Sequence, residues 1–431
     1  TLKDCEISGT KNVGGILGMG YTADIENCAV EDCVIVSEGK RAAGIAANMP
    51  SDGSIKDCVS KNNVITASGS GTNGPADIIT YCTAGTTLSG NTFEGNELIS
   101  YYEVTPENAQ DVLNGKLGSI NNAVIQLTPG VYQDLEFGMP TADADNGVTC
   151  HFNGFNTTAM TVAEFLADPN CGKPGYNSYY EREIKNLTIK GCEGAVIKNI
   201  KSGAGHYYDN TGVGNYDAVR GLTLQGSAYY LNHKYSNIAF ENIDFEGYND
   251  FETSMKDTLI DGMSFKGCTF KNSPSNKQAL RIHNEWTHDT LVQTIKNVVV
   301  ENCQFNNVYQ GVYTGGVYGV TVKNSSFDGL THNAIAVQNN GAAEFDHGKV
   351  WIEGNTFKNG ADRLIRFNKV GADTQITIKN NTATECGDAD GQVIKATSVN
   401  AAVTIACSGN NWGKKGTVTA YAVAPFADVA D

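Results

Sequence analysis

A short phrase recurs along the second half of the chain, and this repeat constrains the fold more than any other feature. It reads apolar, any, apolar, any, Asn or Gly, a small polar residue or Cys, any, and an aromatic. Four strong copies and one weakened copy, MSFKGCTF, VVVENCQF, VTVKNSSF, VWIEGNTF and ITIKNNTA, end at Phe270, Phe305, Phe327, Phe357 and Ala383. Apolar residues at every second position indicate short strands with one face directed into a core.

Related phrases extend this array from about Ile184 to Trp412, at intervals of roughly 22 to 35 residues, which is the range of solenoid repeats. The spacing predicts an all-β parallel β-helix with three short strands per coil and loops of variable length. A leucine-rich repeat would need Leu at fixed places, and a propeller would need blades of about 40 residues with their own signatures. Neither pattern occurs in the sequence.

The charge balance excludes several partners. The 431 residues carry a formal net charge of −16, so nonspecific binding to nucleic acid or to an anionic membrane is not expected. No apolar run approaches the roughly 20 residues that span a bilayer. The chain begins at Thr1 inside a repeat phrase and without an initiator Met. We therefore expect that a targeting segment once preceded it and that the protein is secreted or displayed at the cell surface.

The first hundred residues contain a second repeat, in which a Gly-rich segment follows a strand phrase. Three equivalent copies are NVGGILG at 12–18, RAAGIAA at 41–47 and GPADIIT at 74–80. NVGGILG resembles the GLUG motif of bacterial surface and secreted proteins. A phosphate-binding loop is not expected there, because the Lys and Ser or Thr of such a loop are missing.

A new start follows at Thr105 and Pro106, which predict the N-cap and first position of a short helix near 105–114. The helix precedes NAVIQLTPGVY, a strand, a Pro-Gly turn and a second strand. A short helix before this "IxLxPGxY" strand resembles the N-terminal cap and first coil of the pectate-lyase-like right-handed parallel β-helix family. The resemblance implies a right-handed solenoid whose open end is covered by the helix. We therefore expect a GLUG-like β-repeat module at 1–100 and a β-helix domain at 101–431, with an irregular insertion near 141–183.

The 12 Cys residues mostly occupy the small-residue position of the repeats, where Asn or Ser substitutes for them elsewhere. We therefore interpret them as small side chains stacked at turns or lining the core. A disulfide is the alternative, and Cys150 with Cys171 is the best pair. No CxxC motif supports a zinc site.

The strand after each aromatic aligns from coil to coil, in the segments QALRIHNE, QGVYTGG, NAIAVQNN, RLIRFNKV and QVIKATS. If the apolar residues of these strands point inward, an outward column holds Arg281, Tyr313, Ala336, Arg366 and Lys395. A second column holds His283, Gly315, Gln338, Asn368 and Thr397. Arg pairs with carboxylates and Tyr stacks on sugar rings, so the columns suit a carbohydrate groove. A solvated outer sheet face is the alternative interpretation.

Candidate catalytic residues lie at the end of the first of these strands and in the loop that follows. Arg281, His283 and Asp289 supply titratable groups from which an acid and a base could be drawn. Candidate substrate-binding residues are Tyr313, Gln338, Arg366, Asn368, Lys395 and Trp286. No cofactor is predicted and no residue is assigned to a metal; the alternatives are Ca²⁺, without a recognised motif, and a divalent metal in the loop HNEWTHDTL, whose spacing matches no strong motif.

Family motifs argue against the best-known activities of this superfamily. The NTD, DD and GHG elements of polygalacturonases are absent, apart from fragments such as Asp346-His347-Gly348, and so is the RxPxxR segment of pectate lyases. The family includes lyases, hydrolases and non-catalytic proteins. We therefore expect a protein that binds a polysaccharide or host glycan. If it is also an enzyme, we expect a polysaccharide lyase or glycoside hydrolase. A non-catalytic adhesin or structural surface protein is the alternative.

Overall fold

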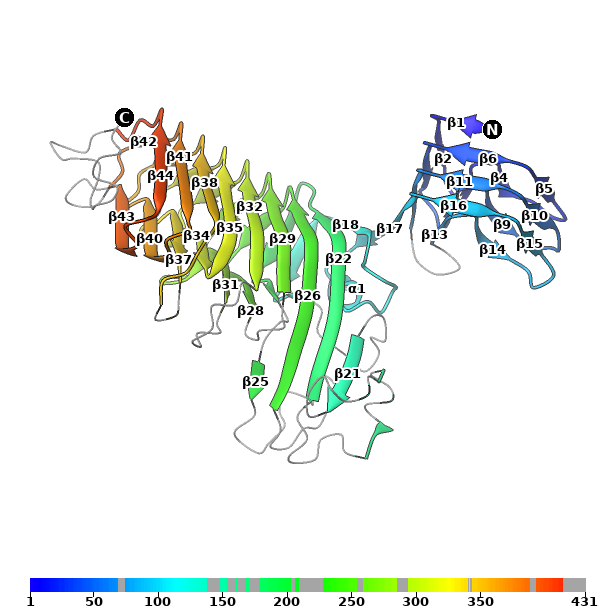
Figure 1. The fold of residues 1–431 in the computed structure, drawn as a ribbon, viewed down its shortest axis with the longest axis horizontal. Helices are drawn as coiled ribbons and strands as arrows, with labels where there is room; N and C mark the ends of the chain where they lie inside the picture. Colours follow the sequence, from blue (N-terminus) through cyan, green and yellow to red (C-terminus); the bar gives the residue numbers. More distant parts are fainter. Residues whose placement is uncertain are drawn as a thin grey trace. The chain divides into compact units, whose positions relative to one another are not determined.

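A computed structural model describes residues 1–68, 74–137, 148–152, 158, 160–161, 164, 167–169, 178–202, 206–208, 228–253, 259–284, 294–339, 341, 343–387 and 393–413. The chain divides into two compact units (Figure 1). The N-terminal unit contains Thr1–Val104 and Gly115–Gln126, and the main unit contains Thr105–Asn114 and Leu127–Asp431. In the described part of the chain, no helix has the length and apolarity needed to cross a bilayer.

The N-terminal unit is a parallel solenoid in which five short strands make up a coil. One sheet contains β1 (Leu2–Lys3), β6 (Ala29–Glu31), β11 (Val59–Lys61) and β16 (Thr92–Glu94), and a second contains β5 (Asp24–Glu26), β10 (Ser54–Lys56) and β15 (Thr87–Ser89). A third contains β2 (Glu6–Gly9), β7 (Val34–Ser37), β12 (Val64–Ser68), β17 (Glu97–Val104) and β18 (Ala123–Leu127). Two more contain β3 (Asn12–Gly14), β8 (Arg41–Ala43) and β13 (Pro75–Ala76), and β4 (Leu17–Met19), β9 (Ala46–Met49) and β14 (Ile79–Cys82).

The Gly-rich segments form equivalent turns of successive coils, as their sequence alignment predicts. Asn12 is in register with Arg41, and Ala42 with Pro75. Gly44 shows why the turn needs a small residue. A Cβ on Gly44 would lie 2.0 Å from Ser60 Oγ and 2.2 Å from the Asp77 carbonyl oxygen, so the coils approach too closely there for any side chain.

The main unit is a parallel β-helix of three sheets, which confirms the all-β parallel β-helix predicted from the repeat (Figure 1). The first sheet contains β22 (Ser178–Lys190), β26 (Ala228–Glu241), β29 (Leu259–Lys266), β32 (Ile295–Glu301), β35 (Val317–Lys323), β38 (Lys349–Glu353), β41 (Gln375–Lys379) and β44 (Thr404–Ser408). The second contains β19 (Gly130–Gln133), β23 (Ala195–Lys198), β27 (Asp244–Glu246), β30 (Thr269–Lys271), β33 (Gln304–Asn306), β36 (Ser326–Asp328), β39 (Thr356–Lys358) and β42 (Thr382–Thr384). The third contains β20 (Glu136–Phe137), β24 (Lys201–Ser202), β28 (Asn249–Thr253), β31 (Gln278–Asn284), β34 (Gln310–Gly315), β37 (Ile335–Gln338), β40 (Ile365–Val370) and β43 (Ile394–Val399).

The aromatic that ends each phrase lies in the second sheet and points into the core. Phe270, Phe305 and Phe327 stack on one another with ring centroids 4.6 and 4.7 Å apart. Phe357 continues the stack 5.2 Å from Phe327, and Ala383 is in register with it on the next strand. These rings are almost completely buried, so the column contributes both apolar burial and ring stacking to stability.

The Asn or Gly letter of the phrase forms the turn between the first and second sheets. Gly267, Asn302, Asn324, Gly354 and Asn380 all have φ between 52° and 66°. In this left-handed region Gly has no steric penalty, and Asn tolerates it better than most residues. The choice of letter therefore follows from backbone geometry.

The next position of the phrase, which holds a small polar residue or Cys, forms an internal ladder of side chains. Asn355 Nδ2 donates to the Val322 carbonyl and Asn381 Nδ2 to the Ile352 carbonyl, each at the preceding coil. Cys268 and Cys303 occupy the same position, with their thiols directed at the Phe240 and Phe265 carbonyls. The ten Cys residues whose state the structure describes are free thiols. The pair Cys150 and Cys171 is not covered, because the side chain of Cys150 and all of Cys171 lie outside the described residues.

A single helical turn, α1 (Ala109–Leu113), belongs to the main unit and buries Ala109, Val112 and Leu113. Its position agrees with the predicted helix near 105–114, but its N-cap is Asn108 rather than Thr105. Thr105 N–H donates to Asn108 Oδ1, and Asn108 N–H donates to the Thr105 carbonyl. These bonds fold 105–108 into a turn, so the helix begins after it.

The predicted irregular insertion is partly regular. β21 (Val148–Phe152) pairs antiparallel with the first half of β22, and β25 (His206–Tyr208) pairs antiparallel with β26. β22 and β26, at 13 and 14 residues, extend well beyond the other strands of the first sheet (Figure 1). Extended strands therefore replace the loop that was expected over this part of the insertion.

Candidate functional site

The third sheet of the main unit brings the predicted outward columns into register. Arg281 pairs with Tyr313, Tyr313 with Ala336, Ala336 with Arg366, and Arg366 with Lys395. The residues that precede them on each strand are buried and form the inward column, Leu280, Val312, Ile335, Ile365 and Ile394. The alignment made from the sequence is therefore confirmed, since parallel in-register coils stack equivalent letters.

The second predicted column is also in register, from His283 through Gly315, Gln338 and Asn368 to Thr397. The preceding strand, β28, extends both columns by one position. Asp250 is the neighbour of Arg281, and Glu252 is the neighbour of His283. Sequence reasoning missed these two acids, although the segment NDFET follows the phrase NIDFEG just as QALRIHN follows MSFKGCTF. Aligning one more coil would have found them.

Asp250 is at the centre of a hydrogen-bonded network. The Tyr248 hydroxyl donates to Asp250 Oδ2 over 2.7 Å, and Arg281 Nη1 donates to the Tyr248 oxygen over 2.7 Å. Arg281 Nη1 also lies 3.4 Å from Asp250 Oδ2, so the guanidinium and the phenol hold the same carboxylate oxygen. The other oxygen, Oδ1, lies 3.1 Å from His283 Nε2.

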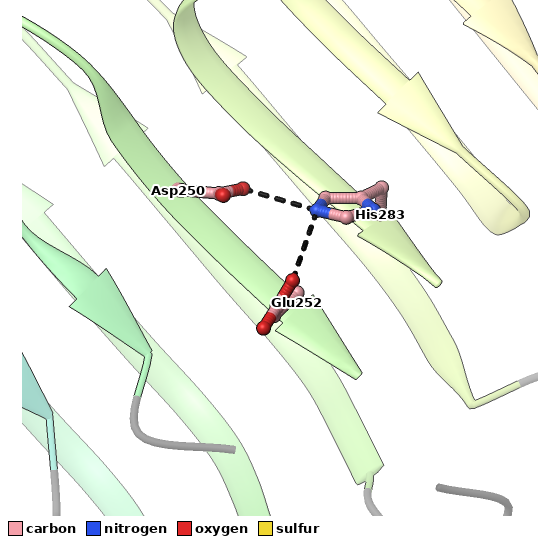
Figure 2. A group of neighbouring side chains, drawn as sticks. All are labelled: Asp250, Glu252 and His283. Carbon is pink, nitrogen blue, oxygen red and sulfur yellow. Dashed lines mark hydrogen bonds and ion pairs between the residues drawn. The ribbon is translucent and has the colours of Figure 1, made fainter. Parts of the chain in front are cut away.

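His283 Nε2 faces a second carboxylate. Glu252 Oε2 lies 3.5 Å from the same nitrogen that faces Asp250, and both interactions end on that one atom in Figure 2. The Nε2 atom and one oxygen of each carboxylate all lie within 4.8 Å of one another. Among the described residues, this is the one group of three metal-ligating side chains that converge in this way.

The network sets the protonation states of its members. Burial acts to raise the pKa of the Asp250 carboxyl, but the hydrogen bond and charge of His283 and the charge of Arg281 outweigh it, so the pKa lies below its ordinary value. Burial also raises the pKa of the Tyr248 hydroxyl, and the Asp250 charge adds to this effect. The site therefore contains an ionised carboxylate beside a neutral phenol at neutral pH.

The exposure of the columns differs from the prediction of an exposed stripe. His283 has no exposed surface and Tyr313 is 9% exposed, while Ala336 and Gly315 are also buried. Arg281 lies over the Tyr313 ring at 5.8 Å, and Gln338 Nε2 donates to the Tyr313 hydroxyl over 2.7 Å. Tyr313 is thus held by its neighbours rather than offered to a sugar ring.

The residues of the columns on β40 and β43 are all at least partly exposed. Arg366, Asn368 and Lys395 are partly exposed, and Thr397 is exposed. Arg281 forms an ion pair with Asp250, whereas neither Arg366 nor Lys395 has one with any residue in the described ranges. The two are neighbours in register, so like charges stand side by side on adjacent strands. We call Arg366 and Lys395 the cationic pair.

Trp286 and Asp289 lie outside the described residues, as does the rest of their loop. The Asp346-His347-Gly348 fragment directly follows Phe345, which forms an isolated bridge with Val370 at the end of β40, but His347 belongs to neither column. His347 is fully buried, with its Nδ1 2.9 Å from the Val317 carbonyl oxygen.

Comparison with known proteins identifies no family. No protein-family model matches the chain, and no curated protein matches its sequence, so the GLUG-like resemblance of the N-terminal unit gains no support. Among solved structures, the chain is similar to a family 28 exopolygalacturonase of Yersinia enterocolitica. That similarity covers 74% of this chain and 79% of the other, at 12% identity and a TM-score of 0.24, a level that carries no argument about function.

Proposed function

We propose that the main unit binds an acidic polysaccharide on the outer face of its third sheet, at the cationic pair and the polar side chains beside it. The observation that carries this proposal is that Arg366 and Lys395 stand side by side without a carboxylate partner in the described part of the chain. Like charges on directly neighbouring strand positions cost free energy. An anionic ligand between them would convert this repulsion into attraction.

The neighbouring side chains favour a sugar over a simple anion. Asn368 lies two residues beyond Arg366 on β40, on the same side of the strand, and Thr397 is its neighbour on β43. An amide both donates and accepts hydrogen bonds, and a hydroxyl does the same, as sugar hydroxyls require. Arg binds a carboxylate through two parallel hydrogen bonds, which suits a uronic acid. The net charge of −16 restricts such binding to a local site.

The test measures binding of a polyuronate, such as alginate or polygalacturonate, by calorimetry, with neutral dextran of similar length as the control ligand. We expect Arg366→Ala and Lys395→Ala each to weaken polyuronate binding about tenfold or more, since a hydrogen bond to a charged group contributes about 1.5–3 kcal/mol. Raised salt should weaken the wild-type interaction. The matched control is Lys358→Ala, which removes an exposed cation from β39 of the second sheet.

Equal binding of dextran and polyuronate, or equal losses in the Lys358→Ala and Arg366→Ala variants, would show that the cationic pair is not the site. Solution viscosity of the polyuronate, followed over time with the same proteins and with Arg281→Ala, separates binding from cleavage. A steady fall that needs Arg281 would add depolymerisation to the function. A constant viscosity with saturable binding would identify a binding protein, and a ligand of this class would place it outside the cell or at its surface.

A further inference from the structure

Three side chains of the third sheet converge on one point. They are two carboxylates and an imidazole, so their chemistry differs from that of the cationic pair on the same sheet. Asp250 and Glu252 are two residues apart on β28, so they project to the same side of the strand. His283 projects from the adjacent strand β31, as the register neighbour of Glu252. From this convergence we propose that Asp250, Glu252 and His283 bind one divalent transition-metal ion, with Zn²⁺ as the best fit (Figure 2).

The distances suit such an ion. His283 Nε2 lies 3.1 Å from Asp250 Oδ1 and 3.5 Å from Glu252 Oε2. With metal-to-ligand bonds of about 2.0–2.1 Å, these separations correspond to angles at the metal of about 100° and about 115°, close to tetrahedral. The two carboxylate oxygens lie no more than 4.8 Å apart, and binding of the ion would turn the partly exposed Glu252 side chain to bring them into the same range.

The residues around Asp250 already orient it as a ligand. Tyr248 and Arg281 both hold its Oδ2 atom, which leaves Oδ1 directed at the point where Glu252 and His283 meet. Outer hydrogen bonds of this kind fix the direction of a metal ligand and are a regular part of metal sites. The sequence alone pointed to His283 and the loop after it as a possible divalent-metal site, but not to Asp250 or Glu252.

Burial and ligand type decide which ion is favoured. His283 has no exposed surface, and the Asp250 and Glu252 side chains are 12% and 30% exposed, so the site opens to solvent on the Glu252 side. Three protein ligands leave a fourth position for water or a substrate oxygen. An imidazole nitrogen favours Zn²⁺ over Ca²⁺, which takes six to eight oxygen ligands. The competing arrangement is a His283 ring whose Nε2 contacts the two carboxylates without any metal.

The test uses the whole chain after treatment with EDTA, and it does not depend on polysaccharide binding. Equilibrium dialysis and calorimetry with Zn²⁺, and separately with Ca²⁺, should give one Zn²⁺ per chain and weaker Ca²⁺ binding. We expect Glu252→Gln, at the partly exposed ligand, to weaken Zn²⁺ binding at least tenfold. The matched control is His332→Gln, which disrupts a His–Asp pair with a 2.6 Å contact to Asp362 but no third ligand, and which should bind Zn²⁺ like the wild type.

Co²⁺ substitution of the wild-type protein provides a readout that needs no variant. A tetrahedral visible spectrum without sulfur-to-cobalt charge transfer would support the three-ligand site, because no Cys belongs to it. Overturning results would be an absence of saturable Zn²⁺ binding, a spectrum dominated by thiolate, or unchanged affinity in the Glu252→Gln variant. Any of these would overturn the proposed metal site.

Discussion

The buried His347 predicts a specific pH dependence of stability. Its side chain is fully buried, and this burial lowers its pKa from an ordinary value of 6.5 to about 4, although the Val317 carbonyl and the Asp346 charge act in the opposite direction. The side chain is therefore neutral in the folded protein at neutral pH, and its Nδ1–H donates to the Val317 carbonyl.

The sign and size of the effect follow from linkage. Above pH 6.5, neither the folded nor the unfolded chain is protonated at His347, so the full stability is present. Below pH 6.5 the unfolded chain binds a proton that the folded chain rejects, and the free energy of unfolding falls by about 1.4 kcal/mol per pH unit. The loss ends near pH 4, where the folded protein also becomes protonated. The gap between the two pKa values corresponds to about 3 kcal/mol in total.

The perturbation is His347→Asn, which keeps a donor near the Val317 carbonyl but cannot titrate. Urea unfolding at several pH values from 7.5 to 4 should show that the variant loses about 3 kcal/mol less than the wild type over this range. Tryptophan fluorescence reports the correct unit, because all three Trp residues lie in the main unit. The comparison between the two proteins cancels the titration of other groups.

The control is Phe305→Leu, which lowers stability without removing a histidine and should keep the wild-type pH dependence. The reasoning would be refuted if the free energies of unfolding of the wild type and His347→Asn stayed parallel from pH 7.5 to pH 4. It would also be refuted if the control variant lost its pH dependence together with His347→Asn.

Two further predictions concern packing. Phe305→Ala should lower the free energy of unfolding by on the order of 3–5 kcal/mol, because its ring is buried and stacked between Phe270 and Phe327, and a loss below 1 kcal/mol in urea unfolding would contradict this. Gly44→Ala should destabilise the N-terminal unit, because the new Cβ would lie 2.0 Å from Ser60 Oγ. The rate of hydrogen exchange in residues 1–104 should then rise. An unchanged exchange pattern would refute the clash.

The repeat allowed most of the fold of the main unit to be predicted. Its apolar and aromatic letters place residues such as Phe305 and Ile335 in the core, and register follows because identical letters stack between parallel coils. The column from Arg281 to Lys395 was predictable for the same reason. The start of α1 was not, because Asn108 and Thr105 hydrogen-bond to each other and form a turn that competes with the expected cap.

Exposure and partnership at the site could not be predicted. An alternating pattern tells which side of a strand a residue occupies, but not what covers it there. Tyr313 is buried because Arg281 lies over its ring and Gln338 binds its hydroxyl. These contacts depend on side-chain rotamers, which the residue types alone do not specify. The acids beside His283 come from a different coil, so no local spacing connects them with it, and only an alignment extended by one coil would have placed them there.

The in-register stacking of the third sheet fixes distances along its outer face independently of loop length. Loops between consecutive strands differ widely, yet residues such as Ala336, Arg366 and Lys395 stand one strand separation apart, about 4.8 Å. Equivalent residues therefore recur on this face once per coil at a constant spacing. Adding or removing a whole coil would lengthen or shorten the face without changing the spacing of the remaining residues, so the length of the face is set by the number of coils.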